Sequence, residues 1–242
     1  MNIGYIGLKV IFKTYHTILP QNGKVVGAEN LPPGAKILAG NHPNATDAFH
    51  LLRILKDRIY FIVQRDLYYI PIFGWCLWLS RQIPVHLKKK HLAILRACEE
   101  LAEGHTVMIF PEGKLNPKYE NFKASTGAVR MSLMTGAPII PVGTYMPAEN
   151  LFTFNLKLPG GVRRGQWQDK GTCYFHIGLP WYPASEFSDN VERAPLVQLT
   201  DMMMEKIRVQ VELARQDYLA DVAQRAPVLA GVKPALPASD GD

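Results

Sequence analysis

The stretch Lys36-Ile37-Leu38-Ala39-Gly40-Asn41-His42-Pro43-Asn44-Ala45-Thr46-Asp47 joins a short apolar run to a polar turn. A short apolar run bounded by turn residues is typical of a buried strand. Asn41 and Asn44 can hold the turn through their side-chain amides, and Asp47 is an acid of the kind that favours the first turn of a helix. The stretch therefore predicts a strand-to-helix junction, which is where α/β sheets place their active sites.

The same stretch places His42 and Asp47 five residues apart. Imidazole changes protonation near neutral pH and can take a proton from a hydroxyl. A nearby carboxylate can fix the imidazole tautomer and stabilise the cation that forms. Taken alone, the pair is also compatible with a loop histidine and a helix-start acid that have no chemical role.

Strands and helices are predicted to alternate along the chain. The apolar runs at 107–110 and 139–142 are typical of strands buried on both faces. We therefore expect an α/β fold: a central mixed, largely parallel sheet covered by helices on both faces. Residues 144–170 are the least regular part. The predicted strands are 36–40, 59–64, 83–86, 106–110, 138–143 and 172–178; the predicted helices are 46–56, 67–80, 89–103, 123–135 and 195–224.

Residues 2–19 predict an N-terminal helix with Lys9, Lys13 and His16 on one narrow stripe and apolar residues around the rest. This pattern favours an amphipathic helix lying in a membrane interface, although packing on the domain with snorkelling lysines is an alternative. The domain organisation expected is a membrane-surface helix at 1–22, one domain at 23–225 and a flexible tail at 226–242.

An aromatic segment spans residues 67–79. Tyr and Trp favour positions where one end of the side chain is apolar and the other is wet, as at a membrane interface. A core helix with large side chains is an equally good interpretation. Its aromatic members are Tyr68, Tyr69, Phe73, Trp75 and Trp78.

The 242-residue chain carries a net charge of +6, which indicates an anionic partner such as a phospholipid surface. A nucleic acid would also suit this charge, but the apolar N-terminal helix does not fit that partner. The three cysteines have no paired spacing, so we expect neither a disulfide framework nor a zinc site. We also expect no secretory signal and no run of the roughly 20 apolar residues that a membrane span needs.

Residues 25–180 resemble the glycerolipid acyltransferases of the lysophosphatidic acid acyltransferase type. One such motif is weak evidence, whereas four in order with ordinary spacing are specific. The four motifs are the His-x4-Asp of Asn41-His42 through Asp47, then Ile83-Pro84-Val85, Phe110-Pro111-Glu112-Gly113 and Ile140-Pro141-Val142.

The resemblance implies that His42 is the general base on a lipid hydroxyl and that Asp47 orients it. The hydroxyl would attack the thioester of acyl-CoA or acyl-carrier protein, the co-substrate, with no covalent intermediate, no cofactor and no metal. The reaction expected is acylation of a lysophospholipid of the 1-acylglycerol-3-phosphate type, by an enzyme peripheral to the cytoplasmic side of a membrane. Candidate substrate-binding residues are Asn41, Pro111, Glu112, Gly113, Lys114 and Lys88.

Two positions depart from the family pattern. The family usually has an arginine where this chain has Leu87 and another where it has Leu115. Guanidinium groups bind phosphate through two hydrogen bonds, and a lysine offers only a point charge. Lys88 and Lys114 are candidate replacements, although Lys88 also suits a solvated helix start. The acceptor could therefore be a non-phosphate lipid or glycolipid, and a non-catalytic lipid-binding protein is the rival from another class.

Three further histidines have weaker interpretations. His86 and His91 flank Lys88–Lys90, but no cysteine or carboxylate accompanies them, so we do not expect a metal site there. His50 lies at helical spacing from Asp47 and is expected to pack near it.

Overall fold

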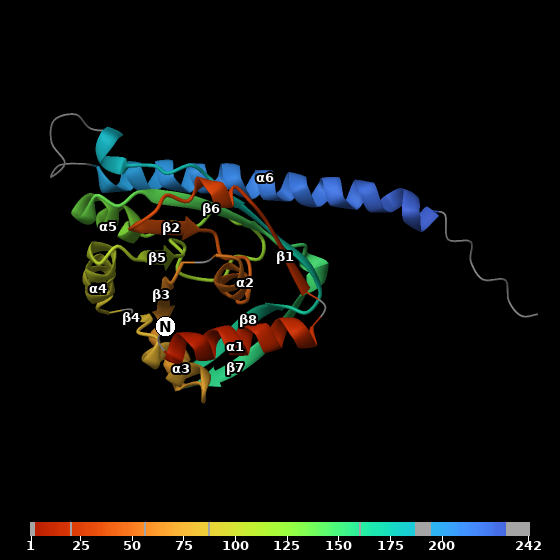
Figure 1. The fold of residues 1–242 in the computed structure, drawn as a ribbon, viewed down its shortest axis with the longest axis horizontal. Coiled ribbons are helices and arrows are strands. Elements are labelled where there is room, and N and C mark those ends of the chain that lie inside the picture. Colours follow the sequence, from red (N-terminus) through yellow and green to blue (C-terminus); the bar gives the residue numbers. More distant parts are fainter. Residues whose placement is uncertain are drawn as a thin grey trace, which may run out of the picture.

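A computed structural model describes residues 3–19, 21–55, 57–86, 88–159, 161–186 and 195–230. Its centre is a seven-stranded sheet in the order β1-β9-β6-β2-β5-β3-β4 (Figure 1). Only β6 and β9 pair antiparallel among these neighbours, so the sheet is mixed and largely parallel. The strands are β1 (Gln21–Val26), β2 (Lys36–Gly40), β3 (Ile59–Gln64), β4 (Ile83–Val85), β5 (Thr106–Ile109), β6 (Ile139–Tyr145) and β9 (Gly171–Ile177).

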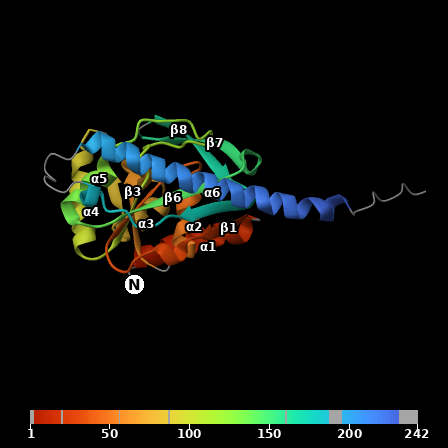
Figure 2. The ribbon, with the colours of Figure 1, turned by 90° about the horizontal axis from the view of Figure 1, so that it is seen from above.

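Helices cover both faces of this sheet (Figures 1 and 2). One core cluster joins the sheet to α1, α2 and α3, and the other joins it to α4, α5 and α6. The predicted α/β fold is therefore confirmed. The helices are α1 (Ile3–Ile18), α2 (Asp47–Ile54), α3 (Phe73–Leu79), α4 (Lys90–Ala102), α5 (Gly127–Thr135) and α6 (Leu196–Ala230).

Alternating side chains of the central strands fill the two cores. In β2, Ile37 and Ala39 point toward α4–α6, whereas Leu38 points toward α1–α3. This follows from the two-residue period of a strand, which sends successive side chains to opposite faces. All five residues of β2 are buried, so β2 is an interior strand with a core on each side.

The region at 144–170 is more regular than its sequence suggested. It forms a separate antiparallel hairpin of β7 (Leu151–Leu158) and β8 (Gly161–Gln168). That prediction was wrong because the hairpin's glycines and charged residues mask a strand pattern that is only partly buried. Strand β1, also absent from the prediction, pairs in parallel with β9 from the far end of the domain.

Three predicted helices differ from the observed ones by four or more residues. The helix predicted at 123–135 is observed as α5 from Gly127. The segment 67–80 is a short 3-10 turn, η2 (Arg65–Tyr69), followed by α3, with a break at Pro71 and at Ile72, whose φ is 64°. Proline disfavours a helical conformation in the residue before it, which explains the interruption. Helix α6 runs to Ala230, five residues past the predicted end of the domain at 225. Residues 231–242 of the predicted tail lie outside the described residues.

Helix α1 packs on the domain through part of its surface. Tyr5, Leu8 and Phe12 are buried against α2 and α3. Ile3 and Val10 remain 75% and 56% exposed. Among the described residues, no helix is both long and apolar enough to cross a bilayer.

Candidate active site

Two of the predicted motifs, the one that holds His42 and the one that holds Glu112, meet at the carboxyl edge of the sheet. His42 follows β2, and Glu112 follows β5. These two strands pair in parallel, from Lys36 opposite Thr106 to Ala39 opposite Ile109, so the turns after them are neighbours. The arrangement agrees with the rule that ligands of open α/β sheets bind outside the carboxyl ends of the strands.

His42 and Asp47 form a hydrogen-bonded pair. The distance from His42 Nδ1 to Asp47 Oδ2 is 2.8 Å. Asp47 is fully buried, and its other oxygen accepts the backbone N–H of Ala48 at 2.6 Å. Since Nδ1 faces the carboxylate, Nε2 is the ring nitrogen left to accept a proton from a substrate.

Two contacts fix the position of the His42 ring and its turn. The ring stacks on Phe110, with centroids 3.9 Å apart and planes 10° apart. In the turn, the Asn44 side-chain oxygen accepts the backbone N–H of Thr46 at 2.8 Å and its hydroxyl at 2.5 Å. The N–H of Ala45 donates to the carbonyl of Gln166 in β8 at 2.8 Å, so the hairpin supports the turn.

Glu112 stands beside the pair and is only partly exposed. Burial raises the pKa of its carboxyl group, while the hydrogen bond from Asn116 and the nearby His42 oppose that shift. The Asn116 amide donates to Glu112 Oε1 at 2.9 Å. Glu112 Oε2 is buried and receives no hydrogen bond of normal geometry from the described residues. A buried oxygen that lacks a hydrogen-bond donor and lies beside a base can accept a hydrogen bond from a substrate hydroxyl.

Asn116 is a site residue that the sequence did not reveal. Its backbone N–H donates to the carbonyl of His42 at 2.7 Å, and its side chain bonds both Glu112 and the backbone of Glu120. The side chain is 3% exposed. An asparagine in a loop carries no period or spacing, and the loop around Asn116 holds several other polar residues, so no signal in the sequence singled it out.

Asn41, Pro111 and Gly113 have structural roles at this edge. The Asn41 amide exchanges hydrogen bonds of 2.8 and 2.7 Å with the backbone of Thr144, and so joins the ends of β2 and β6. Pro111 is buried and accepts the N–H of Ser125. Gly113 has a φ of 66°, a left-handed conformation that favours glycine in the turn. Their substrate contacts remain a prediction.

The two predicted phosphate-binding lysines have different surroundings. The Lys114 ammonium lies 3.3 Å from the centroid of the Phe122 ring, a cation–π contact. Lys88 is exposed and lines a cavity with Arg65, His86 and Arg163. Residue 87, where the family usually has an arginine, lies outside the described residues.

His50 packs near the site, as expected. Its side chain is buried, and its Nε2 lies 2.6 Å from the side-chain oxygen of Gln168. The predicted packing role is consistent with this contact and with the ring of His16, whose centroid is 4.5 Å away.

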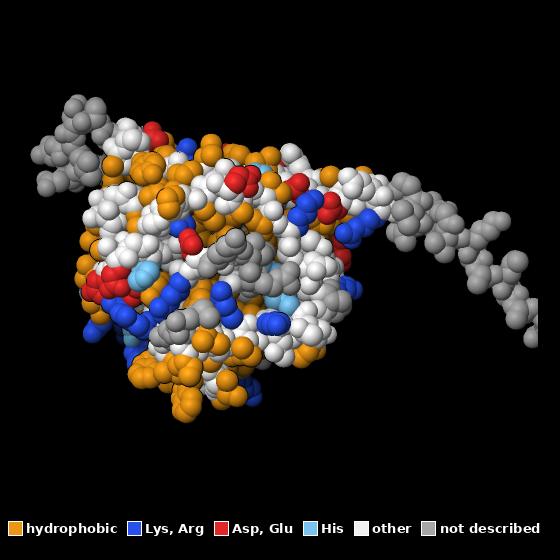
Figure 3. All heavy atoms as spheres, viewed as in Figure 1, with side chains coloured by type: hydrophobic (Ala, Val, Ile, Leu, Met, Phe, Trp, Pro, Cys, Tyr) orange, Lys and Arg blue, Asp and Glu red, His pale blue; other side chains and the backbone are white. Residues whose placement is uncertain are grey.

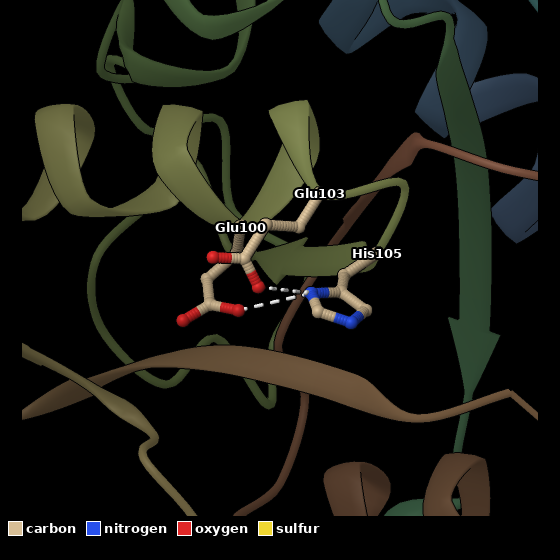
Figure 4. A group of neighbouring side chains, drawn as sticks. All are labelled: Glu100, Glu103 and His105. Carbon is tan, nitrogen blue, oxygen red and sulfur yellow. Dashed lines mark hydrogen bonds and ion pairs between the residues drawn. The ribbon is translucent and has the colours of Figure 1, made fainter.

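A separate cluster could offer three ligand atoms to a metal ion. Figure 4 shows Glu100, Glu103 and His105 at the end of α4 and the start of β5. However, Arg96 Nη2 lies 2.5 Å from Glu100 Oε1, and Arg81 approaches the same oxygen at 3.7 Å. These cations already neutralise the buried carboxylate, and the cluster lies at the amino end of β5, away from His42.

A family model described as Acyltransferase matches residues 22–145, about half of the chain. The chain belongs to this acyltransferase family. A 1-acyl-sn-glycerol-3-phosphate acyltransferase of Pseudomonas aeruginosa is 29% identical over 51% of the chain and 51% of its own length. One of Chlamydomonas reinhardtii is 33% identical over 51% of the chain and 40% of its own length. The chain thus spans about half the length of the curated relatives it matches.

The crystal structure of the 1-acyl-sn-glycerophosphate (LPA) acyltransferase PlsC of Thermotoga maritima has a similar fold. The TM-score is 0.64, and the match covers 88% of this chain and 78% of that chain. At 22% identity this likeness concerns the fold alone.

Proposed function

We propose that this acyltransferase moves a fatty acyl group from a thioester, acyl-CoA or acyl-carrier protein, to the free hydroxyl of a lysophospholipid at a membrane surface. The observation that carries the proposal is the 2.8 Å pair of His42 and the buried Asp47, with His42 Nε2 free to act. The names of the related 1-acyl-sn-glycerol-3-phosphate acyltransferases support a lysophospholipid as acceptor.

The proton and the acyl group follow separate paths in this mechanism. His42 Nε2 takes the proton of the acceptor hydroxyl as the oxygen attacks the thioester carbonyl carbon. The carbon–sulfur bond then breaks, and the departing thiolate takes the proton back from His42. Asp47 holds the imidazole in the required tautomer and stabilises its charged form. No side chain is acylated.

Glu112 would orient the acceptor. Its buried Oε2 can accept a hydrogen bond from a hydroxyl of the glycerol backbone, which places the reacting oxygen near His42. The hydrogen bonds of Asn116 to His42 and to Glu112 hold the base and the carboxylate at a fixed spacing.

An apolar face on α1 and α3 would bind the membrane. The two helices are in close contact, because a Cβ on Gly4 would lie 2.4 Å from Leu79 Cβ. Trp75 and Trp78 are 78% and 72% exposed, and tryptophan favours the interface of a bilayer. Figure 3 shows hydrophobic side chains gathered around α3, with Lys and Arg bordering them. The apolar face comprises Ile3, Ile6, Val10, Ile72, Trp75, Trp78 and Leu79.

The test is acyl transfer by the purified full chain from acyl-CoA or acyl-carrier protein to lysophosphatidic acid, other lysolipids and monoacylglycerol. We expect transfer to a lysophospholipid and its loss in His42→Ala. His91→Ala, which removes an exposed histidine of α4, is the matched control. Transfer that survives His42→Ala would exclude the general-base role.

The same panel separates the rival functions. Transfer to monoacylglycerol but to no phosphate-bearing acceptor would identify a non-phosphate lipid acyltransferase. Lipid binding without transfer from either donor would identify a binding protein.

A further inference from the structure

A basic pocket lies next to the candidate active site. It is a cavity of about 490 Å³ whose charged side chains are Arg65, Lys88, Arg163 and Asp66, with His86 and Tyr69 also in its wall. Asp66 forms an ion pair with Arg163. Arg65 and Lys88 therefore give the pocket an excess of positive charge, which favours an anionic ligand.

The two arginines are held in place by neighbours in the pocket. Arg65 Nη1 contacts His86 Nε2, and Arg163 Nη2 contacts Asp66 Oδ2. Arg163 Nε is buried and has no hydrogen-bond partner among the residues that the structure describes. A guanidinium group has five N–H donors in a planar fork that matches phosphate, so these contacts leave donors available for an anion.

The pocket lies beside the active site along the carboxyl edge of the sheet. His42 follows β2 and Glu112 follows β5; the next strands are β3, followed by Arg65, and β4, followed by His86. Gln64 Nε2 lies 3.5 Å from the carbonyl of Gly113, so the pocket adjoins the turn that holds Glu112. A ligand in the pocket can therefore extend toward His42.

The pocket also adjoins the apolar face. Tyr69 lines the pocket and is 54% exposed. It lies close in the sequence to Ile72 and Trp75, which belong to the apolar face. An amphiphile with its acyl chain at the apolar face could thus present its head group to the pocket. This continuity favours a lipid over a water-soluble molecule as the source of the anion.

We propose that Arg65 and Arg163 bind the phosphate ester of the acyl acceptor and so determine its head-group specificity. This proposal rests on the proposed function. It assigns the role of phosphate ligands to residues after β3 and on the β7–β8 hairpin, which are far apart in the sequence. Acyl-CoA also carries phosphates, so the experiment must separate acceptor from donor.

Arg65→Gln and Arg163→Gln would be compared with wild type in steady-state transfer from acyl-CoA to lysophosphatidic acid. Arg164→Gln is the matched control, since Arg164 is on the same strand, carries the same charge and is exposed outside the pocket. We expect the KM for lysophosphatidic acid to rise at least tenfold in each pocket variant, because a hydrogen bond to a charged group is lost. The KM for acyl-CoA and the kcat should change less than threefold, and Arg164→Gln should behave as wild type.

Equilibrium binding of lysophosphatidic acid without donor gives a readout independent of turnover. If both pocket variants bind lysophosphatidic acid more weakly but wild type transfers no acyl group, the pocket's role in binding phosphate would be supported and the proposed function rejected. Unchanged binding and KM, or an equal effect of Arg164→Gln, would overturn the proposal. A rise in KM for acyl-CoA alone would also overturn it, because the phosphate would then come from the donor.

Discussion

The backbone N–H of Asn116 donates a 2.7 Å hydrogen bond to the carbonyl oxygen of His42. This bond joins two turns that lie 74 positions apart in the sequence. The Asn116 side chain bonds Glu112 at the same time, so one residue sets the spacing between the proposed base and the carboxylate that would orient the acceptor.

Replacement of Asn116 by alanine should therefore affect stability and catalysis together. The Glu112 carboxylate and the backbone of Glu120 would each lose a partner. We expect the free energy of unfolding to fall by about 1–3 kcal/mol in urea titrations, with a lower kcat. Asn155→Ala, on an exposed part of the hairpin, should change neither. Wild-type kcat in Asn116→Ala would show that the two turns do not need this bridge.

Asp47→Asn should leave the fold intact and remove most of the activity. The amide cannot stabilise a charged imidazole and can hold His42 in the wrong tautomer, so we expect kcat to fall roughly a thousandfold. Circular dichroism would check the fold, and single-turnover transfer would measure the chemical step. Asp201→Asn on the exposed surface of α6 is the control. A fall of less than threefold in Asp47→Asn would contradict the orienting role.

The raised pKa of Glu112 predicts a pH-dependent contribution to stability. Burial favours the protonated form in the folded state, so the contribution is fully present below the ordinary Glu pKa of 4.5. It is lost as the pH rises through the higher folded pKa, where a buried charge must form. The free energy of unfolding of wild type minus that of Glu112→Gln should therefore fall with rising pH above about 4.5. Urea titrations across this range would check the sign; a difference that grows with pH would contradict it.

The apolar face predicts binding to lipid vesicles. Trp75→Gln with Trp78→Gln should weaken sedimentation with anionic vesicles by about tenfold or more, because each tryptophan offers a large exposed apolar area. Leu92→Gln with Leu95→Gln on α4 is the control, since these leucines are about half exposed on the other side of the sheet. Equal loss in both double variants would indicate general hydrophobic association instead of a defined face.

Local patterns account for much of the fold and for the centre of the site. Strand β2 was predicted with its observed bounds because five residues buried on both faces leave a continuous apolar signal. The helix that follows was placed one residue early, at 46 instead of Asp47. The two strands of the hairpin were missed because they are only partly buried. The helix predicted at 67–80 was wrong because the chain breaks at Pro71 and Ile72.

The sequence by itself determined most of the alternating strands and helices of the central sheet. It also determined the pairing of His42 with Asp47, because a strand-to-helix turn brings residues five apart within reach of each other. Only the tertiary structure decided which residues surround that pair. Asn116 reaches His42, and Arg163 reaches Asp66, across long stretches of chain. Such contacts depend on how parallel strands and the β7–β8 hairpin are placed beside one another, and no local pattern of residues encodes that placement.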